Sequence, residues 1–290
     1  MILIRDANIL LKELTQVWQN ERMTTMTLIE FFGLIIKPRI TKGKFVFAPL
    51  NNQKINDSIY ALRDKDGNAF VYKKGNDMIA IDCGYKNSPN ISKALYEMGL
   101  DENAVTNLFL THLDLDHAGG VDKRCCRVYP NANVHLGKVE EGYLKRKLFR
   151  KKLLFIGLKT PIKLAENYKL LEDGQISMVG NIKVQSILVP GHTMGHLCYL
   201  VDDKYLFTGD TLLLVQGVGH AFYALWNVDT KALQKSLQKL RDLKGIEIII
   251  TPHSGYTTDI KSAFTHIDQS PNWKEKGYRV SDSAESNPFL

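Results

Sequence analysis

The chain has 290 residues and a formal net charge of +7, with 44% apolar and 24% charged residues. This composition is ordinary for a globular protein, and the length suits one large domain or two small ones. Its apolar runs are shorter than a membrane-spanning helix requires, so no transmembrane helix is expected.

The four cysteines (Cys83, Cys125, Cys126 and Cys198) contain no Cys-x-x-Cys pair, and the two adjacent ones are not expected to form a disulfide. No signal peptide is evident in the sequence. We therefore expect a reduced, cytoplasmic setting, with peripheral membrane association as a further option.

Residues 1–43 are predicted to form a helical extension. Leu10–Trp18 has apolar residues at helical spacing, and Thr27–Ile36 is a second helical stretch. Pro38 is expected to end this second helix because proline cannot continue the helical hydrogen bonds. We expect the extension to pack on the rest of the chain, with a homodimer contact or a membrane surface as alternatives.

The main domain is expected over residues 44–269, and its first part has the short apolar runs typical of strands. Hairpin turns are predicted at Asp66–Gly67 and Gly75–Asn76. A helix over Ser88–Met98 is predicted to begin at the N-cap Ser88 and to end at Gly99. The predicted strands are Phe45–Phe47, Ser58–Leu62, Ala69–Tyr72 and Met78–Ile81.

A polar segment, Thr111–Gly120, follows the predicted strand Val105–Leu110 and holds two histidines and two aspartates. Imidazole nitrogens and carboxylate oxygens are the usual ligands of zinc and related divalent ions. Without a cation, the two neighbouring carboxylates would repel each other. A polar surface turn is the alternative interpretation of this segment alone.

The same pattern recurs at three later strand ends. Each has an apolar run, then Gly or Pro, then a histidine or an aspartate. The three segments are Gly191–His196, Thr208–Thr211 and Thr251–Gly255. This recurrence favours a metal site over a set of unrelated surface turns.

In this order, the segments resemble the metallo-β-lactamase superfamily over residues 55 to 260. The family's first motif is usually His-x-His-x-Asp-His, followed by His, Asp and His at strand ends. The resemblance implies an α/β fold, a four-layer αββα sandwich of two mixed β-sheets flanked by helices. It also implies two divalent metal ions at one edge of the sheets.

The resemblance assigns a role to each motif residue. The first metal ion would be bound by His112 and His192, with Asp114 as a third ligand. The second would be bound by Asp116, His117 and His253, and Asp210 would bridge the two ions. Asp116 would also pass a proton to the leaving group as a catalytic residue.

Two further residues fall within the family's motifs without being expected ligands. His196 belongs to the Gly-His-Thr-x-Gly-His segment. Asp82 matches the family's Asp-Thr-Gly turn and would orient a metal ligand without binding the metal itself. His135, on the predicted strand Val134–Leu136, has no motif neighbour and is expected to be structural.

Asp114 departs from the usual motif, which has a histidine there. A carboxylate is a harder, anionic ligand and favours a harder metal ion. Zinc is the expected metal, with iron or manganese as the alternative, and a mononuclear site without Asp114 as a ligand is a further option.

Lys138–Lys163 holds nine lysines and arginines against two glutamates, with apolar residues between them. We predict a basic amphipathic helix, inserted into the main domain at about residues 138–163. Three interpretations stay open: a solvated face, a pocket wall that attracts anions, and a helix on a membrane surface.

The second half of the chain is expected to supply the second sheet, with strands at Ile176–Val179, Ile182–Val189, Cys198–Val201 and Tyr205–Phe207. A loop is predicted over Gln216–His220, and a helix over Thr230–Leu243. His220 and Tyr223 are candidate substrate-binding residues. The strand Ile246–Ile250 precedes His253, and residues 270–290 are expected to form a polar tail.

The resemblance predicts a hydrolase that uses a metal-bound hydroxide on a small ester, lactone, thioester or amide, with an anionic substrate as one option. Leu213 stands where the similar lactonases have a tyrosine, which argues against a lactone. One alternative is an iron-dependent sulfur dioxygenase or redox enzyme. The other is a non-catalytic, metal-bearing binding protein at a membrane surface. No nucleic-acid partner is expected.

Overall fold

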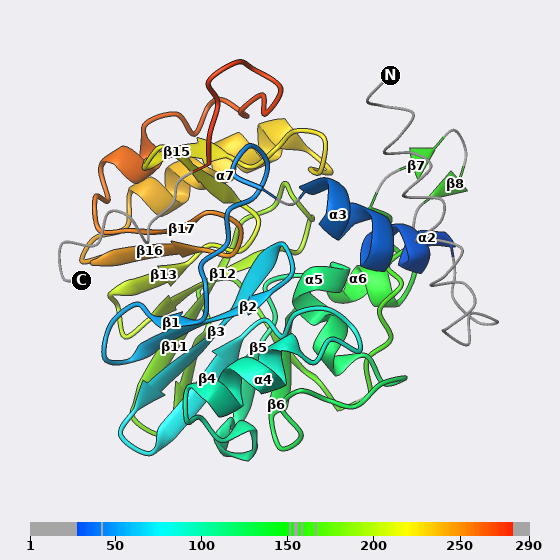
Figure 1. Cartoon of the computed structure of the whole chain (residues 1–290), viewed down its shortest axis with the longest axis vertical. Coiled ribbons are helices and arrows are strands. Elements are labelled where there is room, and N and C mark those ends of the chain that lie inside the picture. The colour runs from blue at the N-terminus through cyan, green and yellow to red at the C-terminus, as the bar shows by residue number, and fades with distance from the viewer. Residues whose placement is uncertain are drawn as a thin grey trace.

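Two β-sheets packed face to face form the centre of the molecule (Figure 1). The computed structural model describes residues 28–41, 43–150, 152–153, 156–157, 159–165 and 167–280. Helices lie on the outer face of each sheet, which gives the four layers of an αββα sandwich. The predicted fold class is therefore confirmed.

The first sheet has seven strands in the order β1-β2-β3-β4-β5-β6-β9. Pairs from β1 to β4 are antiparallel, and β4, β5, β6 and β9 pair in parallel. The strands are β1 (Gln53–Lys54), β2 (Ile59–Asp64), β3 (Gly67–Lys74), β4 (Asp77–Ile81), β5 (Asn107–Phe109), β6 (Asn133–Gly137) and β9 (Lys169–Leu171).

The second sheet has six strands in the order β10-β11-β12-β13-β16-β17, and only β13 and β16 pair in parallel. Its strands are β10 (Ile176–Val179), β11 (Ile182–Leu188), β12 (Leu197–Val201), β13 (Tyr205–Phe207), β16 (Ile248–Thr251) and β17 (Gly255–Thr257). Two hairpins stand apart from the sheets: β7 (Lys152–Leu153) with β8 (Ile156–Gly157), and β14 (Leu212–Val215) with β15 (Val218–Ala221).

Alternation along the strands explains why both faces of each sheet are buried. In β2, Ile59 and Ala61 face the core between the sheets, whereas Tyr60 and Leu62 face the helices. In β12, Tyr199 faces the core between the sheets and its neighbours face the other side. Successive side chains of a strand point to opposite faces, so one strand contributes to two cores.

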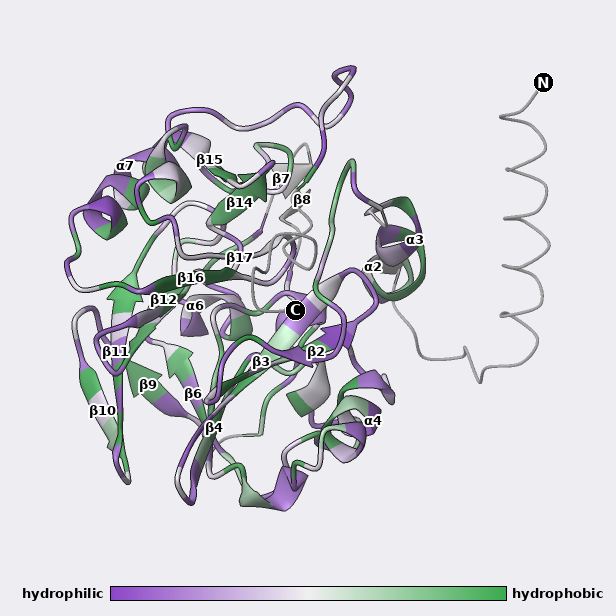
Figure 2. Cartoon of the chain, turned by 60° about the vertical axis from the view of Figure 1, so that its left-hand side comes forward, coloured by the Kyte–Doolittle hydropathy of each residue, from purple (hydrophilic) through white to green (hydrophobic). Residues whose placement is uncertain are grey.

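Two longer helices cover the outer faces. Helix α4 (Asn90–Glu97) packs on the first sheet, and α7 (Thr230–Arg241) packs on the second through three leucines spaced along one face. Figure 2 shows the remaining, hydrophilic face of α7 in purple. Asp229 caps α7 by accepting from the N–H of Ala232 at 3.0 Å. Shorter helical segments are α5 (Leu115–Ala118), α6 (Glu141–Leu144) and 3-10 turns at Glu102–Ala104, Gly119–Val121 and Ser262–Phe264.

A continuous helical segment, Leu28–Thr41, precedes the first sheet, and we call it the roof helix. It consists of α2 (Leu28–Phe31), a π-helical turn (Phe32–Ile36) and α3 (Lys37–Thr41). The prediction that Pro38 ends this helix is wrong. The N–H of Lys37 bonds back to the carbonyl of Phe32, and this wider turn accommodates the proline ring within the helix.

Buried polar contacts hold the roof helix on the rest of the chain. Glu30 is 2% exposed and lies 2.8 Å from Arg124 and 3.6 Å from Lys86. At the other end, the hydroxyl of Thr41 donates to the Asp66 carboxylate. The part of the extension that the structure describes therefore packs on the main domain, as expected.

Three other local predictions are wrong. Phe45–Phe47 is a tight turn instead of a strand, because the N–H groups of Val46 and Phe47 both bond to the carbonyl of Gly43. Gln216–His220 is largely a hairpin, in which Gln216 and Gly217 turn the chain with positive φ. In the basic stretch, helix α6 ends at Leu144 and Arg146 has a φ of 58°, so no amphipathic helix continues to residue 150.

The hairpin turn at Gly75–Asn76, helix α7 and the four predicted strands of the second sheet are confirmed. The predicted helix Leu10–Trp18 and residues 281–290 lie outside the described residues.

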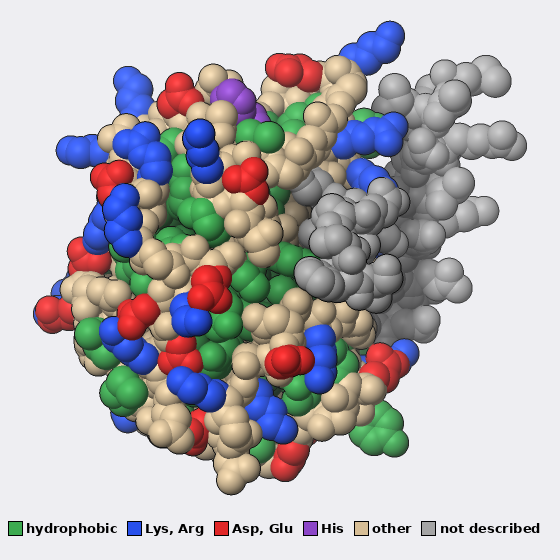
Figure 3. All heavy atoms as spheres, turned by 90° about the vertical axis from the view of Figure 1, so that its left-hand side faces the viewer, with side chains coloured by type: hydrophobic (Ala, Val, Ile, Leu, Met, Phe, Trp, Pro, Cys, Tyr) green, Lys and Arg blue, Asp and Glu red, His purple; other side chains and the backbone are tan. Residues whose placement is uncertain are grey.

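Within the described part of the chain, no helix is long and apolar enough to cross a membrane. The face in Figure 3 has Lys and Arg interspersed with Asp and Glu.

Candidate metal centre

The four motif segments meet at one edge of the sandwich. Strand β5 leads to His112, β13 leads to Asp210 and β16 leads to His253, while His192 follows β11. These strands belong to both sheets, so the fold joins residues that are far apart in the sequence. Glycines allow the chain to turn immediately before two of these residues. Gly191 and Gly209, which precede His192 and Asp210, both have positive φ.

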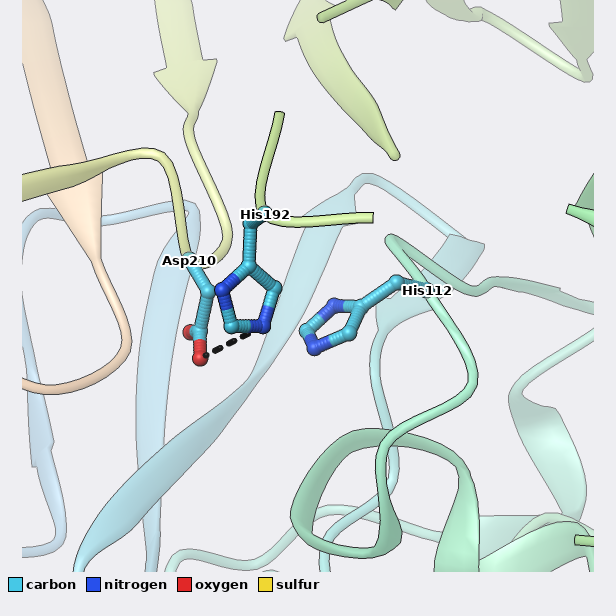
Figure 4. A group of neighbouring side chains, drawn as sticks. All are labelled: His112, His192 and Asp210. Carbon is cyan, nitrogen blue, oxygen red and sulfur yellow. Dashed lines mark ion pairs between the residues drawn. The ribbon is translucent and has the colours of Figure 1, made fainter. Parts of the chain in front are cut away.

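The ligand atoms gather into two groups, each within 4.8 Å. We call His112, His192 and Asp210 the first triad (Figure 4), and Asp116, His117 and His253 the second triad. All six residues are buried.

Asp210 lies between the two triads. Its Oδ2 atom is 3.5 Å from His192 Nε2 in the first triad (Figure 4). Its Oδ1 atom is 3.2 Å from the Nε2 atoms of both His117 and His253 in the second. The two oxygens of one carboxylate thus face different triads, as a bridging ligand requires.

The chemistry of the cluster fits divalent metal ions. Among the described residues, the Nε2 atoms of His112, His117 and His253 and Oδ1 of Asp210 are buried without a hydrogen-bond partner. Buried polar atoms of this kind are rare, because each loses its hydration on folding. A cation at the centre of the donors would satisfy them together.

Hydrogen bonds behind the rings aim the histidines at this centre. Nδ1 of His117 is 2.7 Å from the Asp82 carboxylate, and Nδ1 of His253 is 2.6 Å from the carbonyl oxygen of Asp66. Nδ1 of His112 likewise faces the Thr111 hydroxyl at 3.0 Å. With Nδ1 engaged, each ring presents Nε2 to the cluster.

The carboxylates give the second triad a strong preference for positive charge. Burial lowers the pKa of His253, but Asp210 and Asp116 outweigh burial and raise it to about 9. Likewise, Asp210 and Asp116 raise the pKa of His117 well above its ordinary value, against the opposing effect of burial. Opposite charges at this distance favour the charged form of each group.

Asp114 lies outside both triads and pairs with Arg150. Its Oδ2 atom is 2.7 Å from Arg150 Nη2, 3.3 Å from His192 Nε2 and 3.5 Å from His112 Nε2. Burial opposes ionisation, but the guanidinium holds the pKa of Asp114 well below its usual range. Burial has the larger effect on His192, and together with the positive charge of Arg150 it lowers the pKa of His192 to about 4. Asp114 is therefore beside the first triad, held by a cation of the chain.

The roof helix supplies a second cation. Lys37 Nζ lies 2.5 Å from Oδ2 of Asp116, and both side chains are almost fully buried. Burial alone would lower the pKa of Lys37, but Asp116 and Asp66 raise it above its ordinary value. Lys37 in turn holds the pKa of Asp116 well below its usual range despite burial.

A pocket of about 370 Å³ opens beside Asp114 and Asp116. Its charged lining consists of these two carboxylates and three cations: Lys37, Arg150 and Lys159. The rest of the lining is mainly apolar, from Phe32, Leu115, Pro161, Leu225 and Trp226. A larger cleft of about 660 Å³ lies along the roof helix and contains none of the predicted site residues.

The two predicted substrate residues do not lie at this pocket, and that assignment is corrected. Tyr223 is 2% exposed, and its hydroxyl donates to the carbonyl of Val46 at 2.8 Å. His220 is paired with His266 at the outer hairpin β14–β15. Aromatic residues that follow a motif in sequence can pack into the core instead of reaching the site.

Two other histidines have supporting positions. His196 Nε2 accepts from the N–H of Asp210 at 3.1 Å and so holds the bridging residue in place. His135 Nε2 lies 2.8 Å from the side-chain oxygen of Asn107, and its ring stacks on Phe109. Neither belongs to a triad.

Sequence reasoning missed Lys37, Arg150 and Glu140 at the site. Glu140 is fully buried and accepts from Leu113 N–H and the Thr193 hydroxyl, at 3.0 and 2.6 Å. The density of basic residues around Arg150 was a signal for a pocket wall, but nothing singled out that one arginine. Lys37 stands in an apolar helix without any motif.

Comparisons with known proteins agree with this geometry. The family model described as "Metallo-beta-lactamase superfamily" matches residues 62–253. An atrochrysone carboxyl ACP thioesterase of Pseudocercospora fijiensis is 27% identical over 60% of this chain and 44% of its own length. The probable polyketide biosynthesis zinc-dependent hydrolase BaeB of Bacillus velezensis is 31% identical over 49% of this chain and 52% of its own. The chain thus spans about half the length of these two relatives.

A hydroxyacylglutathione hydrolase of Pectobacterium atrosepticum is 26% identical over 74% of this chain and 72% of its own. A metallo-beta-lactamase family protein of Thermus thermophilus has a similar structure, with a TM-score of 0.54, 20% identity and coverage of 72% and 78%. A B3 metallo-beta-lactamase with an active-site glutamic acid has a TM-score of 0.57, 17% identity and coverage of 85% and 92%. The chain belongs to the metallo-β-lactamase superfamily.

Proposed function

We propose that this chain is a zinc-dependent hydrolase of acyl thioesters. The observation that carries the proposal is the pair of buried triads joined by Asp210, placed directly beside a pocket with apolar walls and cations. A metal site of this kind, open to a pocket on one side, is what metal-assisted hydrolysis requires.

Histidine nitrogens and carboxylate oxygens suit zinc, and each triad offers three of them. The first triad would hold one zinc ion and the second triad another, with Asp210 between them. Zinc bound there would activate water as a nucleophile at neutral pH and polarise the acyl carbonyl.

The side chains of the protein prepare the site for this chemistry. Asp116 lines the pocket, and we assign it the transfer of the proton from the attacking water to the departing thiolate. The apolar walls exclude water and accommodate the acyl chain, as in most small-molecule sites. The lining has three cations against two carboxylates, and this excess of one positive charge favours a substrate that also carries a negative charge.

A thioester is favoured over the other acyl substrates by the relatives, whose names include an ACP thioesterase and a hydroxyacylglutathione hydrolase. A lactone is less favoured, because Leu213 is fully buried in β14 and offers no hydroxyl to the pocket. Iron is less favoured than zinc, because Asp114, the harder donor, pairs with Arg150 outside the triads.

The test is hydrolysis of S-acyl N-acetylcysteamine thioesters by the full chain, with and without a terminal carboxylate on the acyl group. We expect turnover that requires zinc, favours the carboxylate-bearing thioesters and falls at least a hundredfold in His112→Ala. His266→Ala, a histidine substitution away from the pocket, is the matched control and should keep its activity. Equal turnover after complete metal removal, or no turnover of any thioester by the zinc-loaded chain, would overturn the proposal.

A further inference from the structure

Lys37 brings a fixed positive charge into the second triad. Its side chain comes from the roof helix, outside the residues 62–253 that the family model matches. The ammonium lies 2.5 Å from Asp116 Oδ2, and its side chain is only 12% exposed. Lys37 Nζ also lies 6.0 Å from the centre of the Phe47 ring and 5.9 Å from that of Trp226.

The contact involves the same oxygen that the second triad would offer to a metal ion. Oδ2 of Asp116 lies 3.4 Å from His253 Nε2 and 3.5 Å from His117 Nε2, so it points into the triad. A lysine that donates to this atom uses part of its capacity to bind a metal. A divalent ion in the second triad would also lie close to the ammonium and be repelled by it.

The first triad has no such competitor on its carboxylate. Asp210 is 2% exposed, faces histidines of both triads and accepts no lysine or arginine hydrogen bond among the described residues. The neighbouring cation, Arg150, lies 3.1 Å from Nε2 of His192 but has its own carboxylate partner, Asp114, which is not a member of the triad. The two triads therefore differ in the carboxylate that each cation occupies: Lys37 pairs with a triad carboxylate, and Arg150 pairs with a carboxylate outside the triad.

We propose that Lys37 makes the two metal sites unequal: one zinc ion binds tightly in the first triad, and a second binds weakly because the ammonium already partners Asp116. The inference rests on the proposed metal centre but not on the identity of the substrate. It assigns Lys37 as a positioning residue that acts through Asp116, from a roof helix whose Phe32, Gly33 and Lys37 line the pocket.

The experiment is a calorimetric zinc titration of the chelator-treated full chain. Wild type should bind one equivalent tightly and a second at least tenfold more weakly. Lys37→Met, which keeps the length and removes the charge, should bind the second equivalent at least tenfold more tightly and the first with unchanged affinity. Lys37→Arg should restore the weak second site, because it restores the charge.

Lys93→Met on α4, an exposed lysine that pairs with Glu97 far from the triads, is the matched control and should titrate like wild type. Two equally tight equivalents in the wild type would overturn the inference, even if Lys37→Met fails to fold. So would a second-site affinity that is unchanged or weaker in a folded Lys37→Met. Absence of any zinc binding by wild type would instead overturn the proposed hydrolase as well.

Discussion

Glu140 is the buried residue that joins the two loops carrying His112 and His192. One oxygen accepts from the N–H of Leu113, and the other accepts from the hydroxyl of Thr193. Glu140→Ala would leave both donors unpaired in the interior, which costs about 1–3 kcal/mol. It would also loosen the first triad and weaken zinc binding by about tenfold to a hundredfold.

Thermal unfolding and zinc titration check this prediction. Glu172→Ala is the control, because Glu172 is an exposed glutamate whose ion pair with Lys138 should contribute little. Equal, small effects of the two substitutions would show that Glu140 does not hold the loops.

The burial of His135 predicts that the free energy of unfolding depends on pH. Burial, together with Lys169, lowers its pKa to about 4, compared with about 6.5 in an unfolded chain. Between these values the unfolded state binds the additional proton, so the free energy of unfolding falls as the pH drops from 7 towards 4. The contribution of this one group is at most about 3 kcal/mol.

His135→Gln removes the titrating group and can still hydrogen-bond Asn107. Urea unfolding of the metal-free chain at pH 7 and pH 4.5 should show a smaller acid-induced loss in this variant than in wild type. An identical loss in both proteins would mean that His135 does not remain neutral in the folded state.

At the scale of elements, the roof helix is held close to α5 by a glycine. A Cβ atom placed on Gly33 would overlap the terminal Cδ1 methyl group of Leu115, so a larger residue at position 33 must displace that side chain. Gly33→Val should push the roof helix away from α5 and open the pocket to water. We expect thioester turnover to fall about tenfold, with zinc affinity of the first triad unchanged.

The reciprocal substitution provides the control. Adding Leu115→Ala to Gly33→Val removes the overlapping side chain, and the double variant should regain part of the lost activity. Loss of first-triad zinc affinity in Gly33→Val, or no recovery in the double variant, would contradict this role of the roof helix.

For the molecule as a whole, the strands, helices and motif residues that depend on local sequence patterns could be predicted from the sequence. Strand ends that carry His112, His192, Asp210 and His253 follow apolar runs, and such runs must be buried in sheets. The leucine spacing of α7 follows from one buried face, and the αββα order follows from the family resemblance to these motifs.

The remaining parts depend on contacts between distant residues. Lys37 meets Asp116 across 79 positions, and Arg150 meets Asp114 across 36, and neither contact has a local signature. The charge density of the basic stretch suggested a helix, but the chain leaves helical conformation at Arg146 before Arg150 reaches the site. Tyr223 shows the opposite case, an aromatic residue near a motif that is buried in the core.

The central claim is that the two triads form a metal centre, and elemental analysis of the purified chain tests it most directly. Protein prepared without chelators should contain zinc, at one to two ions per chain, and Asp210→Ala should lose most of it because both triads depend on this carboxylate. A wild type without bound zinc that takes up none on addition would contradict the claim, as would an Asp210→Ala variant with full zinc content.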